Sequence, residues 1–231
     1  MDGRLYKWTA APLLLVLLVL ILVSFNRTVG GFNDFLLSSH MHYWNQQKVD
    51  PASDDLLKME RFYQTAASYV PNDPSLLQLG GHLSEWKAYA AADDEERRQL
   101  FTESLIRYRA SIHERPTWPY TWFDLAKAKI RASEIDAEFQ TALINTVRLG
   151  PNERKLQIGV VQLGMLTWES LDEQTQDKVL GVVNIVLNRD PKTLYRAVES
   201  YGRLDLLCSV VTGNDWLENE CSNVWYRTHL S

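Results

Sequence analysis

Hydrophobic positions recur at helical spacing in one segment after another along most of the chain. From Ser53 to Val211, apolar residues return every three or four positions, and aspartate, asparagine, glycine and proline separate the segments. Alternation of apolar and polar residues, which is typical of strands, is missing. The pattern predicts an all-α protein, with helices beginning near residues 53, 74, 93, 118, 135, 152 and 172 and a shorter pair over 194–201 and 204–211.

The N-terminal segment has a different pattern, because no polar face interrupts it. Residues 8–26 carry no charge, and Pro12 to Phe25 reads PLLLVLLVLILVSF. As a helix, these 19 residues span about 28 Å, close to the roughly 30 Å hydrocarbon core of a bilayer. The run ends in Val-Ser-Phe-Asn, which lacks the small residues of a signal-peptide cleavage site. We predict an uncleaved transmembrane anchor, with a cleaved signal peptide as the alternative.

Charges on either side of this segment predict its orientation. Arg4 and Lys7 precede it, whereas Arg27 follows and Asp34 comes soon after. The bias places residues 1–7 in the cytoplasm and exports the rest. We therefore predict a juxtamembrane connector over 27–52, containing Gly30-Gly31, and one helical domain over 53–231.

The spacing of prolines suggests repeated helical hairpins. Pro74, Pro116, Pro151 and Pro191 lie 42, 35 and 40 residues apart. One stretch resembles the tetratricopeptide pattern, in which large residues of a first helix pack against small residues of a second. We predict two or three divergent repeats of this kind, on the basis of Trp122, Leu125, Ala126, Phe139, Ala142, Leu149 and Pro151.

An aromatic stretch, RPTWPYTWFDLA, covers residues 115–126. The repeat pattern assigns Trp122 and Leu125 to the core, and Trp118 shares their helix face. Tyr120 and Phe123 are offset from that face. Trp118, Tyr120 and Phe123 are therefore candidate residues of an interaction groove, with packing in the core as the alternative.

Composition and charge exclude several functions. The formal net charge is −5 and no strongly basic cluster is present, which argues against nucleic-acid binding. Nucleotide-binding, metalloprotease and nucleophile-elbow motifs are absent. We predict no cofactor and no enzymatic activity.

Isolated ionisable residues have simpler explanations than catalysis. Glu169 and Asp172 fit a helix–loop–helix joint, although with Asp124 they are the best carboxylates for a glycan-acting enzyme. His40 and His42 would share one side of an extended chain, but two ligands do not make a metal site. We predict no catalytic or metal-binding residue.

Two further groups of charged residues are interpreted in the same way. His82 and Glu85 are predicted to form a solvated pair on a helix. The acidic run 93–96 is predicted to begin a helix, where negative charge is favourable.

Cys208 and Cys221 are the only cysteines. In an exported domain they are expected to form a disulfide, which would attach the C-terminal tail to the last predicted helix. Two unpaired thiols are the alternative, and the expected state if the domain is cytosolic.

From Pro116 onward, ordered motifs resemble a known family. They are RPTWPYTWFDLAKAKI, DAEFQTAL, LGPNE, LGMLTWESL, QDKVLGVV and LYRAVESYGRLDLLC, followed by Cys221. Together they resemble the VpsP-type family of bacterial polysaccharide-biosynthesis proteins. The resemblance is strongest over 115–221 and includes no catalytic signature.

The resemblance implies one inner-membrane anchor and a tetratricopeptide-like domain in the periplasm. It also implies a role in making or exporting an exopolysaccharide. We therefore expect an adaptor that binds protein components of that machinery, because stacked hairpins offer an extended surface for a protein segment. A carbohydrate-binding module or a glycan-acting enzyme is the alternative, and the polysaccharide is a further candidate ligand.

Overall fold

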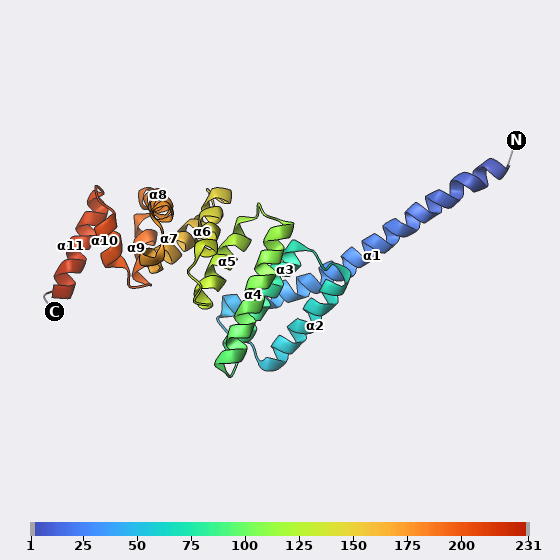
Figure 1. Cartoon of the computed structure of the whole chain (residues 1–231), viewed down its shortest axis with the longest axis horizontal. Helices are drawn as coiled ribbons and strands as arrows, with labels where there is room; N and C mark the ends of the chain where they lie inside the picture. Colours follow the sequence, from blue (N-terminus) through green and yellow to red (C-terminus); the bar gives the residue numbers. More distant parts are fainter. Residues whose placement is uncertain (1–2, 230–231) are drawn as a thin grey trace. The chain divides into compact units, whose positions relative to one another are not determined.

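The chain folds into helices joined by short loops (Figure 1). The computed structural model describes the backbone of residues 3–229 and the side chains of residues 12–222. Over this part of the chain every regular element is a helix, which confirms the predicted all-α class. The elements are α1 Gly3–Gln47, α2 Ser53–Tyr69, α3 Pro74–Ala90, α4 Asp94–Glu114, α5 Pro119–Arg131, α6 Ala137–Leu149, α7 Arg154–Leu166, the 3-10 helix η1 Trp168–Ser170, α8 Glu173–Arg189, α9 Pro191–Glu199, α10 Leu204–Val210 and α11 Asp215–His229.

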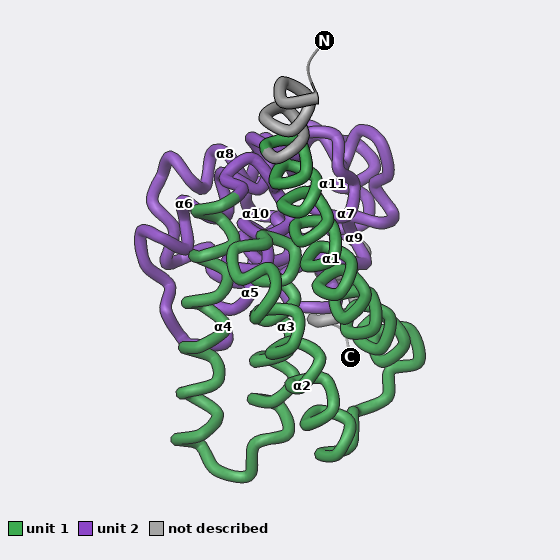
Figure 2. Tube along the Cα trace, turned by 90° about the vertical axis from the view of Figure 1, so that its right-hand side faces the viewer, with its two compact units in different colours: residues 1–114 green, residues 115–231 purple. Residues whose placement is uncertain are grey.

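Two compact units make up the chain, and each is described by itself (Figure 2). Unit 1 covers residues 1–114 and unit 2 covers residues 115–231. The sequence predicted one domain over 53–231, whereas unit 1 includes α1 and the chain divides at residue 115. Helical periodicity locates helices but does not show which of them share a core.

The first half of α1 is the predicted membrane segment. Its apolar side chains from Leu13 to Phe25 are largely exposed. Among the described residues, the stretch from Pro12 to Gln47 is the one helix long and apolar enough to cross a membrane, and a signal sequence would share these features.

The second half of α1 corrects the predicted connector. The helix continues without interruption to Gln47, and Leu37, Met41 and Trp44 are almost completely buried against α2 and α3. Gly30 lies inside this continuous helix and allows close packing, since a Cβ at this position would lie only 2.7 Å from Cγ2 of Val70.

The core of unit 1 joins three helices, and α4 packs along α3. Trp44 of α1 meets Trp86 of α3 edge to face, with ring centroids 5.8 Å apart. The α2–α3 joint follows its sequence signals, because Asp73 caps α3 by accepting hydrogen bonds from the N–H groups of Ser75 and Leu76. Pro74 occupies the first position of the helix.

Helices of unit 2 contact both the next helix and the one after it. Beyond the sequential neighbours, α5 contacts α7, α6 contacts α8 and α7 contacts α9. This order of neighbours is what stacked helical hairpins produce. Gly159 of α7 is needed there, because a Cβ would lie 2.2 Å from Cζ of Phe123. The tetratricopeptide-like assignment itself stays a prediction.

The C-terminal helices are joined covalently. Cys208 of α10 and Cys221 of α11 form a disulfide, with their Cα atoms 5.8 Å apart. The bond closes a 13-residue separation and holds α11 to α10.

Candidate functional site

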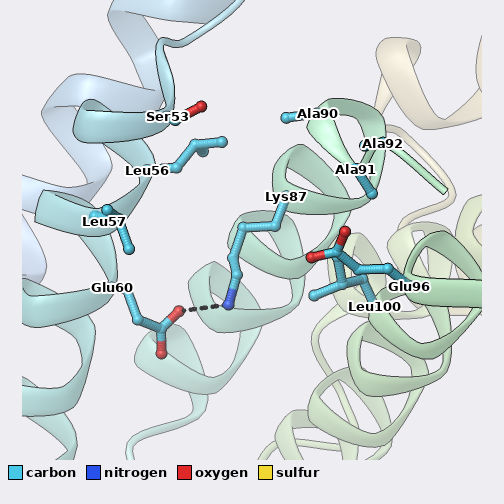
Figure 3. Close-up of a pocket in the computed structure, with 10 residues that line it drawn as sticks. All are labelled: Ser53, Leu56, Leu57, Glu60, Lys87, Ala90, Ala91, Ala92, Glu96 and Leu100. Carbon is cyan, nitrogen blue, oxygen red and sulfur yellow. Dashed lines mark hydrogen bonds and ion pairs between the residues drawn. The ribbon is translucent and has the colours of Figure 1, made fainter.

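A pocket opens among the first turns of α2, the last turns of α3 and the first turns of α4 (Figure 3). We call it the distal pocket, because it lies at the end of unit 1 where α1 ends, far from the apolar half of that helix. Its volume is about 340 Å³, within the range of ligand-binding pockets. Ten residues line it: Ser53, Leu56, Leu57, Glu60, Lys87, Ala90, Ala91, Ala92, Glu96 and Leu100.

Alanines make the distal pocket open. Ala90, Ala91 and Ala92 end α3 and form its connection to α4, and their short side chains leave space that a larger residue would fill. Leu56 anchors one wall in the core, whereas Leu57 is 58% exposed at the opening. The result is an apolar wall of which part already faces solvent.

An ion pair lies on the polar side of the distal pocket, which Ser53 and Glu96 also line (Figure 3). Lys87 Nζ lies 3.2 Å from Glu60 Oε2, and Gln64 donates a 2.7 Å hydrogen bond to Glu60 Oε1. Burial alone would raise the pKa of the Glu60 carboxyl. The hydrogen bond from Gln64 and the charge of Lys87 outweigh this effect and hold the pKa below its usual value. Glu60 is therefore an ionised, already bonded carboxylate at neutral pH.

This arrangement suits binding rather than proton transfer. A general base needs a pKa near the working pH, and the pKa of Glu60 is displaced in the opposite direction. Apolar walls with one ion pair can bury an aliphatic or aromatic side chain and orient a polar group beside it.

The three predicted groove residues lie in unit 2 but do not form one flat surface. The rings of Trp118 and Tyr120 are 5.3 Å apart and tilted by 37°. Tyr120 donates a 2.7 Å hydrogen bond to Glu153, which raises the pKa of the phenol. Phe123 packs over Gly159, so it contributes to the α5–α7 contact.

The repeat positions in this stretch are only partly in the core. Leu125 is buried as predicted, but Trp122 is half-buried and donates its indole N–H to the carbonyl of Pro116 at 2.8 Å. Trp118 is exposed, and the guanidinium of Arg115 lies 4.5 Å from its ring centroid. Trp118 is thus the most exposed of the three predicted groove residues.

The candidate carboxylates have structural roles. Asp172 caps α8 through the N–H of Thr175 at 2.8 Å, as its position in the sequence predicts. Glu169 forms an ion pair with Arg203, which lowers the pKa of the carboxyl. Asp124 is buried on α5 and pairs with Lys127 at 2.8 Å.

The histidine interpretations require two corrections. His40 and His42 lie on a helix rather than an extended chain, so they point to different sides, and His40 bonds to the carbonyl of Leu36. Glu85 is buried, not solvated, because α3 packs closely against α4. Among the described residues, no group of three His, Cys, Asp or Glu side chains is placed to hold a metal ion.

Sequence patterns did not indicate one charged cluster in unit 2. Lys129 of α5 is 1% exposed, and its ammonium lies 2.9 Å from Glu134, 2.9 Å from Asp136 and 2.8 Å from Glu138. Burial alone would lower the pKa of Lys129, but the hydrogen bonds to the carboxylates, Glu138 first, raise it above its usual value. The cluster holds the α5–α6 connection closed.

The one sequence feature that could have indicated this cluster is composition. Three acidic residues follow the otherwise apolar face of this helix within ten positions of Lys129. No sequence pattern indicated the distal pocket, because its lining comes from three separate helices.

Comparisons of the chain with family models, curated proteins and solved structures found no match.

Proposed function

We propose that this protein is a membrane-anchored adaptor that binds a partner protein through the distal pocket of unit 1. In this proposal α1 spans the bacterial inner membrane as an uncleaved anchor and both units lie in the periplasm. The charge bias around the apolar segment supports the orientation. The Cys208–Cys221 disulfide also supports it, because such bonds persist in oxidising compartments.

The biological setting that we propose is exopolysaccharide synthesis or export. The ordered motifs from Pro116 to Cys221 that resemble VpsP-type proteins support this part. The stacked hairpins of unit 2, which we propose are tetratricopeptide-like, suit a binding role. Anchoring would raise the local concentration of the adaptor beside other membrane components of the machinery.

The observation that carries the proposal is the position and lining of the distal pocket. From Asn26 to Gln47, α1 rises about 30 Å, so the distal pocket would lie about that far from the bilayer. A protein partner in the periplasm can reach this height, whereas a lipid tail in the bilayer cannot.

The chemistry of the distal pocket favours an apolar protein segment as the ligand. Leu57 and the three alanines offer apolar surface, while the Lys87–Glu60 pair can orient a backbone or side-chain amide. An amphipathic helix that places two or three apolar side chains into such a groove is a recurrent recognition mode.

Site-specific photo-cross-linking in polymer-producing cells tests the proposal. A photoreactive amino acid replaces Leu57 in one version of the full chain and Ile106 in another. The two positions are a matched pair, because both residues are apolar, lie in unit 1 and are 58% exposed, but only Leu57 lines the distal pocket. We expect a discrete adduct with a protein of the polymer machinery from position 57 and not from position 106.

Two outcomes would contradict this function. Equal labelling from both positions would mean that the distal pocket has no specific partner. If oligosaccharide bound to the purified chain and Trp118→Ala abolished that binding, the carbohydrate-binding alternative would be favoured, since Trp118 is the most exposed of the candidate groove residues.

A further inference from the structure

The outer face of α1 carries large aromatic side chains that stay largely exposed, although Phe25 also meets the ring of Tyr69 of α2 edge to face. Phe25, Phe32, Phe35 and Tyr43 are 57–62% exposed. At 100° per residue they fall on one side of the helix, which we call the aromatic stripe. Leu37, Met41 and Trp44, which pack in the core, lie on the opposite side. A helix that covered a core and faced only water would carry polar residues on the outer side.

Three of the four stripe residues follow a heptad pattern, and Tyr43 lies one residue after a core position. Phe25, Phe32 and Ser39 are seven residues apart, and Phe35 lies between two of them at the second core position of a heptad. In the apolar half of α1, Leu14, Leu18 and Ile21 continue the same two positions, and all three are exposed. One continuous seam thus runs from the membrane segment into unit 1.

The bilayer cannot cover the whole seam. Tyr43 lies 17 residues beyond Asn26, about 25 Å along the helix from the end of the charge-free segment. Headgroup layers add only about 5–8 Å on each side of the hydrocarbon core. The outer aromatic residues therefore need a protein surface if they are to leave water.

We propose that the aromatic stripe is the interface of a parallel homodimer, in which the α1 helices of two copies pack along each other. Two copies inserted in the same membrane have the same orientation, so their stripes lie at the same height. Each residue of a parallel, two-fold pair then meets its own copy, and the surface must be complementary to itself.

Charge distribution on α1 satisfies this requirement. Between Pro12 and Gln47 the only residues charged at neutral pH are Arg27 and Asp34. Both line a small pocket with Val70 and Asp73, on the side of α1 that faces the α2–α3 joint. No like charges would oppose each other across the paired stripes, and Ser39 provides a small residue at the closest approach.

The available area is large enough for a specific pair. With about 60% of each ring exposed, the four aromatic residues offer about 120 Å² each, or roughly 1,000 Å² over two copies. This reaches the lower limit for specific protein interfaces, and packing of the membrane segments adds to it. Confinement to one membrane further favours the pair.

Cysteine cross-linking of the full chain in membranes tests the proposal. Ser39→Cys lies on the aromatic stripe, and Asn45→Cys is the matched control, exposed on the same helix but about 120° away. Under mild oxidation we expect Ser39→Cys to form a covalent dimer in at least fivefold higher yield than Asn45→Cys or the unmodified chain. Equal yields, a bond within one chain, or a bond to a different protein would overturn the proposal.

A second experiment tests self-recognition directly. Phe35 is 62% exposed, so Phe35→Glu and Phe35→Lys should leave the fold of each chain intact. In the Ser39→Cys background, either change alone should reduce the covalent dimer several-fold, because like charges then face each other. Co-expression of the two should restore a mixed dimer. Failure to restore it, with each single change still weakening cross-linking, would show that the stripe binds something other than a second copy. Neither experiment depends on the distal pocket.

Discussion

Lys129→Met removes the ammonium group that three carboxylates share but keeps an unbranched side chain of similar length, so packing inside α5 is preserved. The loss leaves Glu134, Asp136 and Glu138 close together without a counter-charge. Removing one partner of a buried ion pair usually costs about 3–5 kcal/mol. The three carboxyl side chains are 36–53% exposed, so water screens their repulsion. We therefore expect a loss of about 2–3 kcal/mol at pH 7.

The stability lost in Lys129→Met should depend on pH, in a direction set by the pKa shifts of Asp136 and Lys129. Burial alone would raise the pKa of Asp136, but hydrogen bonds from the Phe139 N–H and from Lys129 lower it below 3.8. A lowered pKa stabilises the fold above the unfolded value, and this contribution is lost as the pH falls through the folded pKa. Lys129 has a raised pKa, so its contribution persists up to pH 10.5 and is lost only as the pH rises through the folded pKa. As the pH falls through the lowered pKa of Asp136, part of the pairing with Lys129 is lost, so the destabilisation by Lys129→Met should be smaller at about pH 2.5 than at pH 7.

Urea unfolding of the full chain in detergent, followed by circular dichroism, measures the free-energy difference. Hydrogen exchange of the α5 and α6 amides shows whether the loss is local to unit 2. Lys155→Met is the matched control, because Lys155 is exposed on the same unit, and it should change stability by less than about 0.5 kcal/mol. A loss below about 0.5 kcal/mol for Lys129→Met at pH 7, or an equal loss at both pH values, would refute the reasoning.

Three other substitutions test the packing described above. Gly30→Ala should destabilise unit 1 by about 1–3 kcal/mol and speed hydrogen exchange at the α2–α3 joint, because the new methyl group has no room. Gly31→Ala is the control. It has open space around it and should be neutral or stabilising. Gly159→Ala should lower the melting temperature of unit 2, and Gly181→Ala, in the middle of α8 with no neighbour in reach, should raise it slightly. Cys208→Ser should make α11 sensitive to protease at concentrations that leave the unmodified chain intact, with a loss of about 3 kcal/mol in the free energy of unfolding. Unchanged proteolysis would show that packing alone holds α11.

The sequence predicted local structure well where local chemistry determines it. Caps such as Asp73 and Asp172 bond to N–H groups two or three residues away, so their roles can be read from spacing alone. The prediction that the acidic run 93–96 begins a helix is confirmed in the same way, with Asp93 accepting a hydrogen bond from the Glu96 N–H at the start of α4.

Features that depend on distant contacts were not predictable in this way. Residues 27–52, with Gly30-Gly31, were predicted as a connector outside the helical domain, but α1 continues through them and Val70 packs closely at Gly30. Trp122 matched a repeat position, yet it is only half-buried. The distal pocket and the Lys129 cluster join residues whose proximity follows from tertiary structure.

The uninterrupted α1 has a mechanical consequence. A helix without a hinge acts as a lever, so if its apolar half spans a membrane as proposed, unit 1 must follow any change in its tilt. A change in tilt of about 10° would displace the far end of this lever by about 5 Å over its 30 Å length. If the proposed anchor is correct, a change in bilayer thickness that altered this tilt would also move the distal pocket of unit 1.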